Sequence, residues 1–85
     1  MPSHRILVVE DEPAIAEAVA ERLRAEGFTA VIARDGLDAV ERFRRSAPDL
    51  VVLDLMLPGL DGLEVCRRLQ AERPVPVLML TARGE

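Results

Sequence analysis

Four short apolar runs divide the chain into alternating segments. They occupy residues 6–9, 28–33, 50–57 and 77–80, and more polar stretches separate them. The first run is rich in β-branched residues and shows no alternation of apolar and polar positions, which is typical of a strand covered on both faces. The pattern predicts four strands with helices between them.

The intervening stretches carry apolar residues at the spacing of one helix face. Pro13 suits the first turn of a helix, where no N–H is needed, and Gly27 suits the position after its last turn. Asp35-Gly36 is a cap signal before the second helix, which residues 46–48 should end. The predicted apolar stripes are Ile15, Ala18, Val19 and Leu23 in the first helix, Leu37, Val40 and Phe43 in the second, and Leu63, Cys66 and Leu69 in the third.

Strands that alternate with helices through short connections favour a parallel sheet. Each helix then returns the chain to the same end of the sheet by a right-handed crossover. We therefore expect one α/β domain, a doubly wound parallel sheet, over residues 1–85.

The composition is that of a small globular protein. Of the 85 residues, 49% are hydrophobic, which favours a packed core over disorder. The net charge of −4, with acids and bases interspersed, provides no basic patch for nucleic acid or an anionic membrane. Cys66 is the single cysteine, and acids follow the first apolar run too soon for a signal peptide or membrane span there. These features predict a cytoplasmic protein without membrane contact.

Polar residues stand at the carboxyl ends of three predicted strands, where open α/β sheets bind their ligands. Glu10, Asp11 and Glu12 follow the first run, Asp54 lies near the end of the third, and Thr81 follows the fourth. If the first and third strands are neighbours, Glu10, Asp11 and Asp54 meet in one crevice, where their charges repel unless a cation is present. Carboxylate oxygens without a nearby His or Cys favour Mg²⁺.

Each acid also has a purely structural interpretation. Glu12 suits the start of a helix, where its charge complements the helix dipole. Glu10 and Asp11 could form a solvated turn, and Asp54 could cap a backbone segment or form one half of an ion pair. Their joint placement at strand ends favours a site over these alternatives.

An aspartate beside Mg²⁺ indicates phosphoryl transfer, because a carboxylate oxygen can attack phosphorus and form an aspartyl phosphate. Asp54 is the candidate nucleophile, and the Thr81 hydroxyl would reach the phosphoryl group from a neighbouring strand end. The chain has no G-x-x-x-x-G-K-[ST] loop for nucleotide phosphates. Its one histidine is His4, so it also has no Ser-His-Asp or Cys-His arrangement.

Three segments of the chain resemble the receiver domain of bacterial two-component response regulators. They read ILVVEDEP at 6–13, VVLDLMLPGLDG at 51–62 and VLMLTARGE at 77–85, and their order and spacing match the family along the whole chain. The resemblance implies a flavodoxin-like fold with strand order 2-1-3-4 in the part present. The last segment is also similar to regulators whose output is a winged-helix DNA-binding domain.

The resemblance further implies roles for individual residues. Asp54 would be the phosphoacceptor, receiving the phosphoryl group from a phosphohistidine of a sensor histidine kinase. Mg²⁺ would be held by Asp11 directly, by Glu10 through water, by Asp54 and by the backbone carbonyl of Met56. Thr81 would supply the switch hydroxyl. The loop of the site would be shaped by Pro58 and Gly62.

Residues 1–85 correspond to the first part of a receiver domain, since the family continues with a fourth helix, a fifth strand and a fifth helix. The fifth-strand lysine that contacts the phosphoryl group in the family has no counterpart among them. We therefore expect weak Mg²⁺ binding and slow or undetectable phosphorylation of these residues. We also expect an uncovered edge on the fourth strand, through which copies could associate. DNA would be contacted only through a separate output domain.

Two other functions are open at this point. A Mg²⁺-dependent phosphohydrolase would use the same aspartyl phosphate, but such enzymes commonly carry a second acid two residues after the nucleophile, where this chain has Met56. An interaction domain that is never phosphorylated would not require the acids. The favoured interpretation is a signalling module that catalyses only its own phosphorylation and dephosphorylation, and is not an enzyme with turnover.

Overall fold

The computed structural model describes residues 4–80 of the chain. Strands and helices alternate along this part, as the apolar pattern predicts. The elements are β1 (Arg5–Val9), α1 (Pro13–Ala25), β2 (Thr29–Ala33), α2 (Gly36–Ser46), β3 (Leu50–Asp54), α3 (Gly62–Glu72) and β4 (Val77–Leu80).

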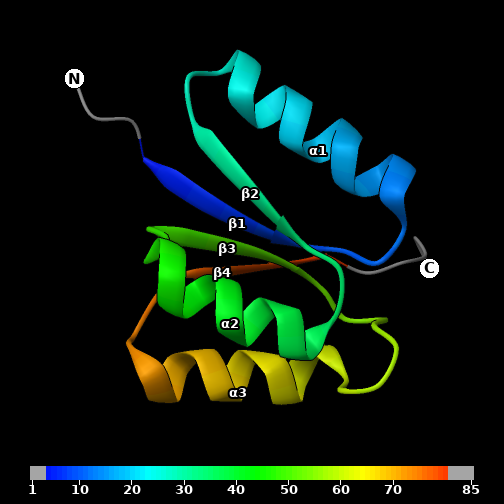
Figure 1. The fold of residues 1–85 in the computed structure, drawn as a ribbon, viewed down its shortest axis with the longest axis vertical. Coiled ribbons are helices and arrows are strands. Elements are labelled where there is room, and N and C mark those ends of the chain that lie inside the picture. Colours follow the sequence, from blue (N-terminus) through cyan, green and yellow to red (C-terminus); the bar gives the residue numbers. More distant parts are fainter. Residues whose placement is uncertain (1–3, 81–85) are drawn as a thin grey trace.

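The strands form one parallel sheet in the order β2-β1-β3-β4 (Figure 1). β1 lies between β2 and β3, with Val9 opposite Ala33 on one side and Leu53 on the other. The observed order confirms the predicted 2-1-3-4 arrangement. Because all four strands run in the same direction, their carboxyl ends lie along one edge of the sheet, which is where ligands bind in such folds.

Helices cover both faces of the sheet. α1 lies on one face, and α2 and α3 lie side by side on the other (Figure 1). The larger of two buried clusters lies on the α2–α3 side and includes Phe43, Leu53 and Leu69. The smaller cluster contains Ile6 and Val8 and packs against apolar residues of α1. The central strands are therefore shielded from water on both faces, which explains their unbroken apolar runs.

The predicted helix faces are partly wrong. Ile15, Leu37 and Leu63 belong to predicted buried stripes, but they are 48%, 69% and 61% exposed, and Ala18 is exposed as well. Phe43 and Leu69 are buried as predicted. The other buried helix residues are mostly small: Ala16 and Ala20 in α1, Gly36 and Ala39 in α2, and Gly62 and Val65 in α3. Small side chains let a helix approach a sheet closely, so steric fit as well as hydrophobicity decides which face is buried.

β3 ends at Asp54, although the third apolar run continues to residue 57. The prediction that the third strand continues beyond Asp54 is therefore wrong. Leu55 and Leu57 belong to the loop before α3, and Leu57 packs against the larger buried cluster. Apolar residues here anchor a loop to the core, and Asp54 becomes the last residue of its strand.

The predicted end signals act as expected. Asp35 accepts the N–H of Asp38 at 2.8 Å and caps the N-terminus of α2. Gly27 has a φ of +97°, a left-handed conformation that follows the last turn of α1. Pro13 occupies the first position of α1. A backbone N–H at this position would have no acceptor within the helix, so proline costs no hydrogen bond there.

Candidate functional site

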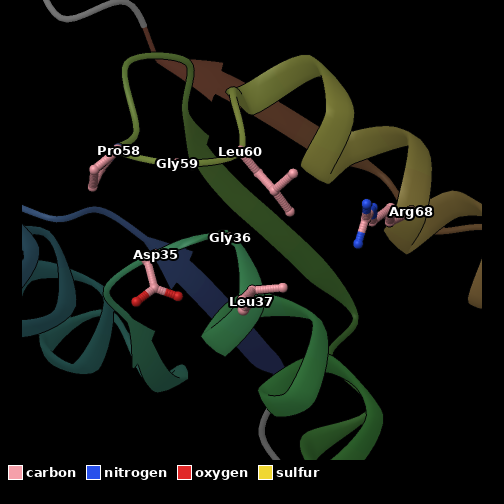
Figure 2. Close-up of a pocket in the computed structure, with 7 residues that line it drawn as sticks. All are labelled: Asp35, Gly36, Leu37, Pro58, Gly59, Leu60 and Arg68. Carbon is pink, nitrogen blue, oxygen red and sulfur yellow. The ribbon is translucent and has the colours of Figure 1, made fainter.

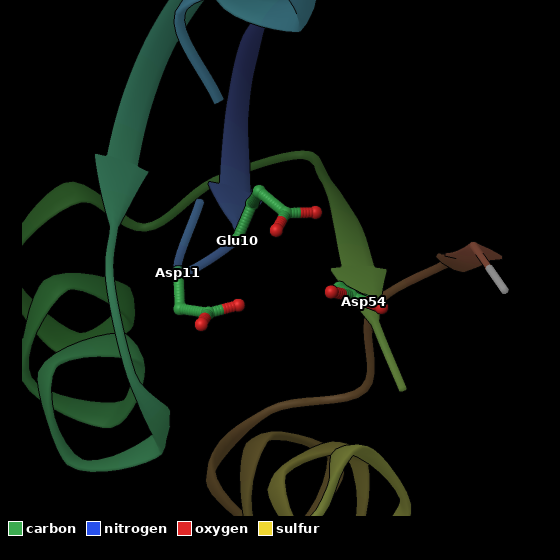
Figure 3. Close-up of side chains that lie close together, drawn as sticks. All are labelled: Glu10, Asp11 and Asp54. Atoms are coloured by element: carbon green, nitrogen blue, oxygen red, sulfur yellow. The ribbon is translucent and has the colours of Figure 1, made fainter. Parts of the chain in front are cut away.

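Three acidic side chains meet at the carboxyl end of the sheet. Glu10 and Asp11 follow β1 and Asp54 ends β3, and the parallel pairing of these strands brings their ends together. One oxygen from each carboxylate lies within 4.8 Å of the others (Figure 3). Glu10 and Asp54 are each 5% exposed, whereas Asp11 is open to solvent. The structure thus brings together the three acids that the sequence places at strand ends.

Backbone hydrogen bonds hold the two buried carboxylates. Glu10 Oε2 accepts the N–H of Glu12 at 3.0 Å. Asp54 Oδ1 accepts the N–H of Met56, also at 3.0 Å. Each buried acid is therefore bonded to the backbone two residues further on, a local arrangement that limits side-chain rotation at the strand end.

The electrostatics of the cluster favour a cation. Burial raises the pKa of Glu10, because a desolvated carboxylate is less stable than the neutral acid. The hydrogen bond from Glu12 opposes this rise, and the charges of Asp54 and Asp11 add to it. Within residues 4–80, no Arg or His forms an ion pair with any of the three acids. A hard divalent cation would relieve the repulsion, and an all-carboxylate donor set suits Mg²⁺.

The acids line an open cleft of about 450 Å³, whose walls are completed by Glu12, Ile15, Met56 and Leu80. Ile15 and Met56 are 48% and 54% exposed, so apolar side chains border an acidic centre. Sequence reasoning assigns Ile15 to the core and misses it as a site residue. The signal that could have found it is its place in the first turn of α1, directly after the acids.

Three further predicted residues are Glu12, Met56 and Thr81, and the structure describes the first two. Glu12 precedes α1 and makes no side-chain cap, which agrees with an exposed charge at the helix start. Met56 donates its N–H to Asp54, while its carbonyl as a metal ligand stays a prediction. Thr81, the predicted switch hydroxyl, lies outside the described residues.

Gly62 shapes the loop that follows Asp54. Its N–H donates to the carbonyl of Leu55 at 3.2 Å. A Cβ at Gly62 would lie 2.6 Å from the Cα of Leu55 and 2.9 Å from the carbonyl oxygen of Asp54. Any larger residue must therefore displace the backbone beside Asp54, which accounts for a glycine at this position. Pro58 lies in the same loop at an exposed position.

The response regulator receiver domain family matches residues 6–85, and the chain belongs to this family. It is 52% identical over 81 residues to the DNA-binding response regulator MtrA of Mycolicibacterium smegmatis, and 51% identical over 78 residues to the sensory transduction protein RegX3 of the same species. The matches cover 95% and 92% of this chain but 36% and 34% of the relatives. The chain therefore spans about a third of the length of these relatives.

Solved receiver structures share the fold. The crystal structure of the response regulator protein TrrA from Thermotoga maritima, in complex with Mg(2+)-BeF, matches with a TM-score of 0.89 and 39% identity. The match covers 95% of this chain and 71% of that chain. Together with the strand order, it identifies the flavodoxin-like receiver fold. Among residues 4–80, no helix has the length and apolar character needed to cross a membrane.

Proposed function

We propose that Asp54 accepts a phosphoryl group and that this modification is the signal carried by this cytoplasmic receiver domain. The observation that supports the proposal most is the position of the Asp54 carboxylate. It is 5% exposed at a strand end, within a cluster of three acids whose oxygens lie within 4.8 Å. Burying a carboxylate among like charges is unfavourable, so chemistry that uses the cluster explains it better than a structural role does.

Mg²⁺ would be held by Asp11, Asp54 and the backbone carbonyl of Met56, with Glu10 acting through water. The donor set supports this assignment, because its carboxylates converge and are not neutralised by ion pairs within residues 4–80. When bound, the ion would neutralise the charge on the phosphoryl oxygens. The similarity to TrrA, whose structure contains Mg(2+)-BeF, supports the same choice of cation.

In the proposed reaction, a carboxylate oxygen of Asp54 attacks the phosphorus of a phosphohistidine on a sensor histidine kinase. An O–P bond forms and the P–N bond breaks. The electron pair of the broken bond stays on the imidazole nitrogen, which takes up a proton. The hydrogen bond from the Met56 N–H to Oδ1 keeps the carboxylate oriented during transfer. Thr81 would contact the transferred group as the switch hydroxyl.

The phosphorylated domain would act on an output domain and would not turn over a substrate. One relative is a DNA-binding response regulator, so we propose transcriptional control through a winged-helix domain in the full protein. DNA would be contacted by that domain alone. The net charge of −4 supports this division of roles, because a nucleic-acid surface needs a basic patch.

Self-association through the edge of β4 is a second proposed contact. In the described part of the chain, β4 is an outer strand of the sheet, and Leu78 on it is 56% exposed. An uncovered apolar edge strand favours pairing with another chain. Sedimentation velocity at increasing concentration should show a dimer, and a monomer at all concentrations would rule the contact out.

Incubation with acetyl phosphate and MgCl₂, followed by intact-mass spectrometry, tests the phosphoacceptor. We expect slow addition of one phosphoryl group to the wild type, as the sequence of residues 1–85 predicts, and none to Asp54→Asn or in the presence of EDTA. Glu12→Gln is the matched control, since Glu12 lines the cleft outside the three-acid cluster and its loss should leave phosphorylation intact. Equal phosphorylation of Asp54→Asn would contradict the assignment. Release of many equivalents of phosphate from an ester would instead indicate the phosphohydrolase. A wild type that stays unmodified after prolonged incubation would indicate an interaction domain.

A further inference from the structure

The outer edge of β2 carries backbone groups that β1 does not satisfy. β2 is an outer strand of the sheet (Figure 1), and its Thr29 N–H and Ala33 carbonyl bond to residues that flank β1. Successive residues of a strand direct their backbone groups to opposite edges, so the N–H and C=O groups of Ala30 and Ile32 point away from β1. An edge of this kind is a template for pairing with another strand.

The helix that follows β2 packs toward the middle of the sheet. A Cβ at Gly36 would lie 2.8 Å from Cγ2 of Val65 and 2.9 Å from Cβ of Leu60, so the start of α2 is in close contact with α3 and the loop before it. Figure 2 shows the first turn of α2 facing residues 58–60 across an open cleft of about 570 Å³. Because α3 packs against β3, on the far side of β1, shielding of the outer edge of β2 depends on other groups.

The Arg24 side chain of α1 reaches this edge. Its Nη2 donates to the outward carbonyl of Ala30 at 3.0 Å. Arg24 itself is exposed, whereas Ala30 is only 7% exposed although it belongs to an outer strand. The guanidinium therefore occupies an acceptor of the edge and places a positive charge beside it. Charged side chains at a sheet edge oppose the addition of another strand.

β2 of a second copy is the strand that would match this edge. In an antiparallel pair of β2 strands with Val31 at the two-fold axis, Ala30 of each copy lies opposite Ile32 of the other. Each such pair exchanges two N–H···O bonds, so four bonds would satisfy all the outward groups of these residues. The acceptor for the incoming N–H of Ile32 is the Ala30 carbonyl, to which Arg24 already donates.

The oblique path of α1 is compatible with such an antiparallel pair. Ile15, near the start of α1, lines the acidic cleft with Asp54 of β3, whereas Arg24, near its end, bonds to β2. In an antiparallel pair, the two helix ends that overhang β2 lie at opposite ends of the joined strands. The side chain of Arg24 is then the group that meets the incoming strand.

We propose that Arg24 keeps the outer edge of β2 closed to pairing with β2 of a second copy. Its guanidinium competes with the incoming strand for the Ala30 carbonyl. In a paired dimer the two Arg24 side chains would also stand over carbonyls displaced by two residues, roughly 7 Å along the strands. Salt screens their repulsion only in part at such a separation. This role is independent of the modification of Asp54 and of the proposed contact at β4.

Sedimentation velocity of the 85-residue chain over a concentration series tests the proposal. Arg24→Ala should associate at least about tenfold more tightly than the wild type. Two of the four intermolecular hydrogen bonds then no longer compete with a guanidinium, and each contributes roughly a factor of five. Arg24→Met keeps much of the side-chain length without an N–H donor and should behave in the same way. Alanine and methionine are strong helix formers, so both variants retain α1.

Arg22→Ala is the matched control. Both arginines lie in the last turn of α1, but Arg22 pairs with Glu26 of its own helix end and not with the sheet. Its replacement removes the same charge from the same turn, so Arg22→Ala should associate as the wild type does. An equal gain in Arg22→Ala, or no gain in Arg24→Ala and Arg24→Met, would overturn the proposal.

Amide hydrogen exchange followed by NMR locates the new contact. In the wild type, the outward amides of Ala30 and Ile32 should exchange faster than the amide of Val31, which faces β1. In Arg24→Ala at the same high concentration, both outward amides should gain protection while the amides of β4 stay as in the wild type. A gain of protection at β4 alone, or none at β2, would show that Arg24 does not close this edge.

Discussion

Replacing Asp54 by asparagine should stabilise the metal-free protein. Asparagine keeps an oxygen that can accept the N–H of Met56, but it removes one of three negative charges whose oxygens lie within 4.8 Å. Two unit charges at that separation repel by about 1 kcal/mol in water and by about 3 kcal/mol at an effective dielectric constant of ~20. Because Asp11 is exposed and its charge is screened, we expect a net gain of about 1–2 kcal/mol in the free energy of unfolding.

Thermal denaturation followed by circular dichroism, first in EDTA and then with MgCl₂, measures this effect. For a domain of this size, each 1 kcal/mol raises Tm by about 4–8 °C. Mg²⁺ should raise the Tm of the wild type, because a ligand that binds only the folded state stabilises it. The variant has lost a proposed ligand, so its Tm should respond much less. The two curves should therefore approach each other or cross as MgCl₂ increases.

The same substitution at Asp49 is the matched control. Asp49 Oδ2 accepts the N–H of Arg5 at 2.8 Å and lies 3.6 Å from Nδ1 of His4, so its charge has favourable partners. Asp49→Asn should therefore lower the Tm in EDTA, the opposite sign to Asp54→Asn. If both variants lose stability in EDTA, repulsion does not dominate at the three-acid cluster and the reasoning is refuted.

Three further outcomes are expected. The N–H of Arg5 holds the pKa of Asp49 below its ordinary value of 3.8. The ionised Asp49 therefore stabilises the fold above that pH, and this stabilisation is lost as the pH falls through the lower pKa of the folded state. Urea midpoints measured against pH should show a smaller acid-induced loss of stability in Asp49→Asn than in the wild type. Gly62→Ala should reduce the free energy of urea unfolding by about 1–3 kcal/mol, since its Cβ meets the backbone of Leu55, and an unchanged midpoint would show that the loop yields freely. Asp35→Ala should reduce the same quantity by about 1 kcal/mol through loss of the α2 cap, whereas Leu37→Ala at an exposed position should change it little.

Signals that act over a few residues were predictable from the sequence. Pro13, Gly27 and Asp35 mark helix ends because each satisfies or removes a backbone requirement at its own position. Which face of each helix is buried was less predictable. Ile15 and Leu37 have the right hydrophobicity and spacing, yet they are exposed, because the sheet accepts the helix face that fits most closely.

The end of the third strand shows the same limit. The apolar run continues past Asp54, where the strand ends. An unbroken apolar run by itself cannot distinguish a strand from a loop whose side chains pack against the core. After Asp54 the chain leaves the strand, and Leu57 packs against the larger buried cluster. This is a tertiary contact, which the local sequence pattern does not reveal.

The amino-acid sequence alone determined the alternation of strands and helices and placed acids at the strand ends, because run length and turn residues act locally. Local patterns are compatible with several strand orders, so the residue pattern alone left the order open and the family resemblance implied 2-1-3-4. The tertiary structure places β1 beside β3. That pairing brings Glu10 and Asp11 beside Asp54, far away in the chain, and buries two of the three carboxylates. The acids acquire their mutual repulsion, on which the proposed cation site depends, from this proximity and from the burial of two of them.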